Sequence, residues 1–161
     1  MRTSLFDRQH LMDYTLYGIL SGIFYSITVW LYLYDPEFRH LWMMYVGNGF
    51  FMFIIMLYMF NLVRGQDENR PGFKIISAGH LAVISGIIVS AAICLFLCFV
   101  YKPEVFSSID DVTGGHKPGA SLLHVFGPAI LMNFLAGSFI TLVIGYATKW
   151  NLQANSKSVS W

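Results

Sequence analysis

The sequence predicts an all-α membrane protein with four transmembrane helices, and three observations lead to this fold class. Of the 161 residues, 56% are hydrophobic and only 12% are charged, about half the charged share of a typical soluble domain. The charges are confined to segments between long apolar runs. Each run is long enough for one helix across a hydrocarbon core about 30 Å thick, and too short for two. We therefore expect a single polytopic domain over residues 1–161.

The four charge-free runs define the expected spans and the connections between them. They predict helices over residues 14–34, 41–63, 75–101 and 122–148, with a long outer loop over residues 102–121. Pro36 and Pro103 follow the first and third runs closely, and the residue before a proline disfavours helical geometry. A soluble bundle would need charged outer faces at helical spacing, and these runs contain no charged residue.

The distribution of lysine and arginine predicts the orientation. Seven of the ten lie in the N-terminal segment, the second connection and the C-terminal segment, and three lie in the other two connections. The seven are Arg2, Arg8, Arg64, Arg70, Lys74, Lys149 and Lys157. The positive-inside rule then places both termini in the cytoplasm and the loop over residues 102–121 outside.

Small residues recur at every fourth position in three of the four spans. They are Gly18, Gly22 and Ser26 in the first, Ala78, Ala82, Gly86, Ser90, Cys94 and Cys98 in the third, and Ala129, Asn133, Gly137, Thr141 and Gly145 in the fourth. Such stripes favour close helix packing in a bilayer. A four-residue step drifts about 40° per repeat around a 3.6-residue helix. We therefore expect the third helix to be central, with one neighbour early in its stripe and another late.

The two cysteines belong to this small-residue series. Cys94 and Cys98 are spaced C-x-x-x-C, whereas redox pairs are usually C-x-x-C. We interpret them as small apolar packing residues, with a redox or metal role as the alternative.

Charged residues are absent from the expected spans, which argues against proton relays, ion-coupled transport and voltage sensing. Asn48 and Asn133 are the polar residues expected at membrane depth. They should pair with each other, with the backbone or with water in a cavity. Together with His124 and Pro128, which removes one helical hydrogen bond and favours a kink, they form a candidate outward-facing polar pocket. The favoured interpretation is that the amides hold helices together, and the pocket is the alternative.

The histidines offer two further hypotheses, neither of which the spacing favours. His40, His116 and His124 are expected on the outer side, where Asp110 and Asp111 could join them around a divalent metal. Haem would need two facing imidazoles, and the candidate pairs are His80 with His10 and His124 with His40. No two of the outer residues have a ligand spacing such as i, i+4, and His10 and His40 lie outside the expected spans, which weakens both haem pairs. We therefore expect no metal and no cofactor.

Enzyme signatures are missing from the sequence. It contains no phosphate loop, nucleotide fingerprint or H-E-x-x-H motif, and no basic aromatic surface for nucleic acid. We therefore expect a non-enzymatic membrane protein with no catalytic residue, which contacts lipid and packs with itself or another membrane protein as an accessory subunit. A small neutral-solute transporter or channel is the first alternative, and a membrane redox protein with haem is the second.

Two motifs resemble those of a known family. They are Tyr17-Gly18-Ile19-Leu20-Ser21-Gly22-Ile23 in the first span and Pro71-Gly72-Phe73 before the third. With the long loop before a glycine-rich fourth span, they resemble a family of small four-helix bacterial inner-membrane proteins, common in Bacteroidota, whose function is unknown. The resemblance implies a multi-pass protein of the bacterial inner membrane and assigns no catalytic residue. That family often has an acidic residue where this chain has Ser77, Gly79 and His80.

Overall fold

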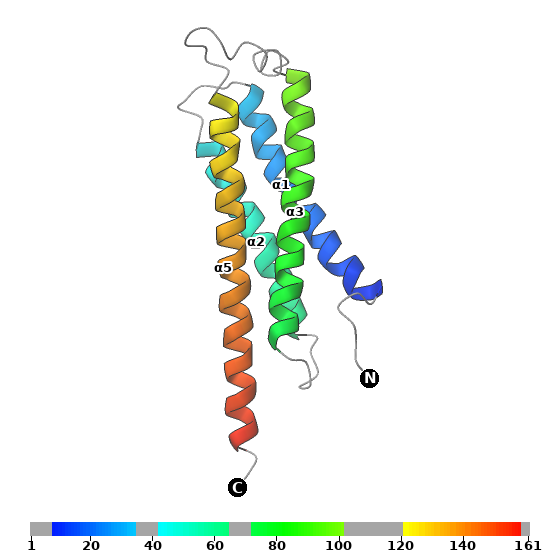
Figure 1. Ribbon diagram of the computed structural model, residues 1–161, viewed down its shortest axis with the longest axis vertical. Coiled ribbons are helices and arrows are strands. Elements are labelled where there is room, and N and C mark those ends of the chain that lie inside the picture. Colours follow the sequence, from blue (N-terminus) through cyan, green and yellow to red (C-terminus); the bar gives the residue numbers. More distant parts are fainter. Residues whose placement is uncertain (1–7, 35–41, 65–71, 102–120, 159–161) are drawn as a thin grey trace.

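The computed structural model describes residues 8–34, 42–64, 72–101 and 121–158, and all of them are helical (Figure 1). The helices are α1 (Arg8–Tyr34), α2 (Trp42–Arg64), α3 (Gly72–Tyr101) and α5 (Ser121–Ser158). Each contains a segment long and apolar enough to cross a membrane, namely Leu11–Tyr34, Trp42–Arg64, Ile75–Tyr101 and Gly127–Thr148. The predicted all-α class with four candidate membrane spans is confirmed. The expected outer loop lies outside the described residues, apart from Ser121.

The helices form a bundle in which successive helices run in opposite directions (Figure 1). α1 and α5 each pack against both α2 and α3, and α2 also contacts α3 across the bundle. We call the end where α1 and α3 finish and α2 and α5 begin the upper end, and the opposite end the lower end. α3 therefore contacts all three other helices, in agreement with its expected central position.

The small-residue stripes lie on buried faces. All fourteen stripe positions of α1, α3 and α5 are buried within the chain. On the α1–α3 side, a Cβ added to Gly18 would lie 2.8 Å from the Ala82 carbonyl oxygen. On the α3–α5 side, a Cβ added to Gly137 would lie 2.8 Å from Cγ2 of Val83. These distances are too short for a real Cβ atom, so only glycine fits at Gly18 and Gly137. The stripes therefore bring neighbouring helices close together.

The middle of the α3 stripe faces α1 and, at Gly86, also Phe51 of α2, but it does not turn towards α5. Ala82, Gly86 and Ser90 face α1, and the thiol of Cys94 hydrogen bonds with the side chain of Ser26 on α1. α5 is contacted instead through Ile76, Gly79 and Val83, on an adjacent face of α3. α1 is inclined across α3 (Figure 1), and a ridge of every-fourth residues is itself inclined to the helix axis. The inclined helix can therefore follow the drifting stripe.

The outside of the bundle is apolar over most of its length. Large side chains such as Ile88, Phe99 and Phe139 are more than 60% exposed. Soluble monomers rarely expose so much contiguous apolar surface, whereas lipid-facing helices require it. Aromatic residues mark the ends, and Trp30 Nε1 donates a hydrogen bond to Tyr101 Oη over 2.9 Å near the upper end. The outer surface therefore fits a multi-pass membrane protein.

Two helices extend beyond their expected limits. α1 begins at Arg8, and its candidate span Leu11–Tyr34 includes the exposed Asp13, so the expectation of spans without charge is wrong there. α5 continues as a helix to Ser158 and projects past the other helices at the lower end (Figure 1).

Candidate functional site

Three buried polar side chains lie in the upper half of the bundle. Tyr25 on α1 and Asn133 on α5 are each 1% exposed, and Asn48 on α2 is 7% exposed. Each lies on the inward face of its helix, beside small or aromatic residues that the bundle also buries. We call these three residues the amide core, because two of them carry a carboxamide.

The packing contacts of α3 place the two amides at nearly the same depth. On α5, Thr141 lies at the level of Gly79 and Gly137 at the level of Val83. One further turn puts Asn133 near residue 87 of α3. On α2, Met59 lies at the level of Gly79 and Phe51 at that of Gly86, which puts Asn48 near residue 89. The difference of two or three residues corresponds to about 3–5 Å along the bundle axis.

Tyr25 lies beside Asn48 on the α1 side. Its ring atom Cδ2 lies 3.1 Å from the position of a Cβ on Gly47, the residue next to Asn48. The ring therefore lies between α1 and α2 at the level of Asn48.

The polar atoms of the amide core have no hydrogen-bond partner among the described residues. This applies to both Nδ2 and Oδ1 of Asn133, to Oδ1 of Asn48 and to the hydroxyl of Tyr25. Asn48 and Asn133 are therefore not paired with each other, and Asn133 makes no bond to the described backbone. The expected pairing of the two amides with each other is therefore excluded.

Other buried hydroxyl groups in the bundle behave differently. Each donates to a carbonyl oxygen three or four residues earlier in its own helix, over 2.7–3.0 Å. They are Ser21, Ser26, Thr28, Ser90 and Thr141. An asparagine side chain has donors as well as acceptors and is not satisfied this way. A buried polar group without a partner costs about 1–3 kcal/mol. The amide core carries such a cost, and so does Oγ of Ser138, the one further buried side-chain polar atom without a partner among the described residues.

The chemistry of the amide core is neutral hydrogen bonding. Asn133 presents two N–H donors and one acceptor, Asn48 presents a free acceptor, and a phenol can donate or accept. None of the buried residues among the described ones is an Asp, Glu, Lys or Arg. The arrangement can therefore hold a small uncharged molecule that carries both donors and acceptors, but it has no group to compensate an ion.

Of the other two residues of the expected pocket, Pro128 does not join this core. Pro128 and its neighbour Gly127 are exposed on α5, and a Cβ on Gly127 would contact nothing within 4 Å. Pro128 lies inside the helix, which continues through it. Pro128 is thus an exposed residue above the core and not part of its lining. The side chain of His124 lies outside the described residues.

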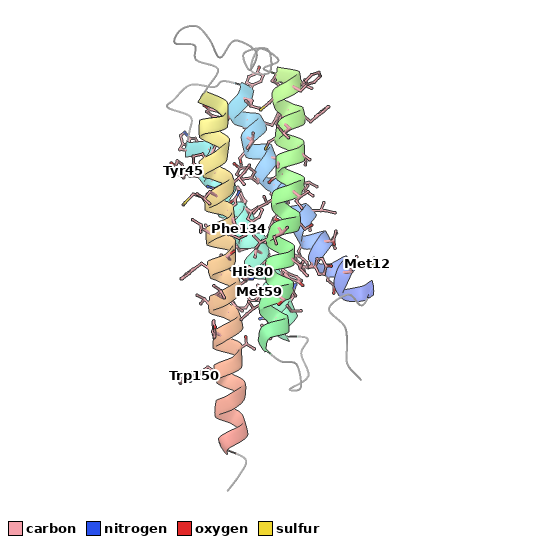
Figure 2. All side chains as sticks on the ribbon, in the orientation of Figure 1. Met12, Tyr45, Met59, His80, Phe134 and Trp150 are labelled. Carbon is pink, nitrogen blue, oxygen red and sulfur yellow. The ribbon has the colours of Figure 1, made fainter. Side chains whose placement is uncertain are left out.

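The lower half of the bundle is closed by tight packing around Gly79. A Cβ there would lie 2.6 Å from Sδ of Met59 and 2.5 Å from Cγ2 of Thr141. His80 Nδ1 lies 2.9 Å from the Ile76 carbonyl oxygen and 3.2 Å from Oγ1 of Thr141. The view with side chains (Figure 2) labels His80 and Met59 below the level of Phe134, which follows Asn133. The amide core is therefore separated from the lower end by close-packed side chains.

The hypotheses of metal and haem gain no support from the side chains that can be placed. The described residues contain no group of three or more His, Cys, Asp or Glu that could hold a metal. Cys94 and Cys98 are both free and buried. The side chains of His10, His40, His116 and His124, and of Asp110 and Asp111, lie outside the described residues, and with them both haem pairs and the outer metal site.

The sequence reading overlooked two polar features. Tyr25 was not distinguishable from other tyrosines of an aromatic-rich span. At the lower end, Asn61 Nδ2 donates to Tyr17 Oη over 2.6 Å, and the rings of Tyr17 and Tyr58 lie 5.2 Å apart. Asp13 interacts electrostatically with Tyr58 in the same place. The spacing of Asp13 and Tyr17, four residues apart on one helix face, was the available signal for this group.

Comparison with known proteins does not indicate a function, so the functional argument rests on the candidate site. No family model matches the chain. Neither a curated protein nor a solved structure is significantly similar to it.

Proposed function

We propose that this protein is a non-enzymatic multi-pass membrane protein that passes a small neutral polar solute, and that the solute binds at the amide core. The observation that carries the proposal is Asn133, whose side chain is 1% exposed while both of its polar atoms lack a partner among the described residues. Polar groups at membrane depth are costly and are typically retained at pathways and binding sites. A solute that bonds to the amide would offset that cost.

The depth of the amide core supports this function. Asn48 lies six residues inside the candidate span Trp42–Arg64, which is about 9 Å from the upper end of α2 at 1.5 Å per residue. The tightly packed lower half argues against a permanently open channel. A carrier that alternates between states, with the described one closed below, accounts for both features.

Flux across a bilayer tests the proposal. Purified full-length protein in liposomes should accelerate the re-swelling that follows an osmotic step with urea or glycerol. Asn133→Leu should abolish that acceleration. Asn61→Leu is the matched control, because Asn61 is an exposed amide at the lower end that bonds to Tyr17. Equal re-swelling of empty liposomes and of liposomes with wild-type protein would overturn the proposed function.

The accessory-subunit hypothesis stays a prediction. It is motivated by the small-residue stripes, by spans without charge and by the absence of soluble machinery. The stripes are buried in the chain's own interfaces, so they do not offer a surface to a partner. Its test is the oligomeric state in mild detergent and the proteins that copurify. The haem hypothesis also stays a prediction, and a visible absorption spectrum without a Soret band would end it.

We also propose that the protein resides in a bacterial inner membrane with both termini in the cytoplasm. Seven of the ten lysine and arginine residues on one side and the resemblance to an inner-membrane family support this placement. The upper end, and with it the amide core, would then face outward. A reporter active only in the cytoplasm, fused after Trp161, should be active, and activity of a periplasm-specific reporter there would reverse the orientation.

A further inference from the structure

We infer that the amide core selects a primary amide or a urea over a polyol or water. The inference rests on the proposed function, since it names the solute class that the same site would take. It follows from the shape and the hydrogen-bonding pattern of the free polar atoms, which are more specific than polarity alone.

The side chain of Asn133 sets the geometry. A carboxamide carries an N–H donor and a C=O acceptor side by side in one plane, and in Asn133 both atoms lack partners among the residues described. The complement of such a pair is another planar group with a donor beside an acceptor. A primary amide or a urea provides this group and can form two parallel hydrogen bonds with Asn133.

The other two residues supply bonds for the rest of an amide. Oδ1 of Asn48 is a free acceptor at nearly the same depth as Asn133, offset by about 3–5 Å along the bundle axis. The Tyr25 hydroxyl has no partner among the described residues either. The inference assigns the second N–H of the solute to Asn48 and the carbonyl oxygen of the solute to the Tyr25 hydroxyl.

A polyol fits this pattern poorly. Its hydroxyl groups lie on tetrahedral carbons and point in different directions, so they cannot present a coplanar donor and acceptor to Asn133. A single water molecule bridges groups through a few short bonds, but it cannot form a parallel pair with one carboxamide and also span the core. A charged solute would meet no compensating group among the buried side chains described.

Ligand-dependent thermal unfolding in mild detergent tests the inference. Acetamide and glycerol are the probes, applied to the wild-type protein, Asn133→Leu and Asn61→Leu. A molecule that binds only the folded protein raises its melting temperature in a concentration-dependent way. We expect acetamide to raise the melting temperature of the wild-type and Asn61→Leu proteins relative to Asn133→Leu, and glycerol to give no such difference. Loss of two hydrogen bonds should weaken acetamide binding at least about tenfold.

The outcomes separate this inference from the proposed function. An acetamide shift that depends on Asn133, without flux in liposomes, supports the site and overturns transport. Flux and an Asn133-dependent shift for glycerol but not acetamide overturn the inference and leave transport standing. Identical shifts in all three proteins overturn the inference, because they reflect a general solvent effect. Should Asn133→Leu not fold, Asn48→Leu takes its place, and the same loss of the acetamide shift is expected.

Discussion

Gly22 on α1 and Gly86 on α3 bring two helix backbones into direct contact. A Cβ at Gly22 would lie 2.7 Å from the carbonyl oxygen of Gly86, and one at Gly86 would lie 2.8 Å from the ring of Phe51 on α2. Real Cβ atoms do not approach neighbouring atoms so closely. The packing of three helices therefore depends on the absence of side chains at these two positions. Because lipid is as apolar as the helices, close packing contacts, and not the hydrophobic effect, hold such helices together.

The first prediction concerns this crossing. Gly86→Leu should lower the free energy of unfolding by about 1–3 kcal/mol or more, because the new side chain overlaps Phe51 and the side chain of Ser21. Gly49→Leu is the matched control, since a Cβ there meets nothing within 4 Å. Thermal unfolding and size-exclusion profiles in mild detergent measure the difference. Equal stability of the two variants would show that the crossing is not closely packed.

The second prediction concerns the contact between α3 and α5 in the lower half. Thr141 is fully buried, and its hydroxyl donates to the Ser138 carbonyl and lies 3.2 Å from His80 Nδ1. Because that hydroxyl already donates, we infer that His80 Nδ1–H is the donor between the two side chains. Thr141→Val keeps the shape and removes the bond, and should cost about 0.6–1.5 kcal/mol.

Thr148→Val is its control. The Thr148 hydroxyl bonds only within its own helix, to the Ile144 carbonyl over 2.7 Å. Its loss should cost clearly less than the loss of Thr141 in the same unfolding measurement. A Thr148→Val protein destabilised as much as Thr141→Val would mean that the bond between helices contributes nothing.

The sequence predicts where the helices lie in the chain better than it predicts which helices pack against each other. A bilayer requires long apolar runs, so the gaps between charges locate the four candidate spans to within a few residues at most ends. Helix inclination depends on the whole bundle and leaves no local signal, so the neighbour of the α3 stripe could not be predicted. Asp13 was missed for a related reason, because α1 begins before the charge-free run.

The candidate site was predictable only in part. Asn48 and Asn133 are recognisable as polar residues at membrane depth, and the structure brings them to a similar level. Their failure to pair depends on side-chain positions across two helices, which the spacing along one chain does not determine. Pro128 was predicted on the assumption that a helix-breaking residue lines a pocket, but it lies on an exposed face.

The third prediction concerns the cysteines. Cys94 and Cys98 are free and no more than 6% exposed, and Cys94 bonds with the side chain of Ser26. Both thiols should therefore resist a maleimide–polyethylene glycol reagent in native membranes and react fully in SDS. An exposed control is Asn61→Cys in a background with Cys94→Ala and Cys98→Ala. Labelling of the native cysteines as fast as this control would contradict their burial.

The last prediction concerns the stability of the amide core without solute. Asn133→Leu keeps the branched side-chain skeleton and removes two buried polar atoms that lack partners among the described residues. It should raise the free energy of unfolding by about 1–3 kcal/mol, because the cost of desolvating an unsatisfied amide disappears. Asn133→Ala should instead lower stability, since it leaves a cavity in the core. Thermal unfolding of the wild-type, Asn133→Leu and Asn133→Ala proteins in solute-free mild detergent gives the comparison.

A clear loss of stability in Asn133→Leu would show that the Asn133 amide holds the helices together through hydrogen bonds of its own. A gain of stability in Asn133→Leu supports a binding role, because the amide then destabilises the protein in the absence of solute.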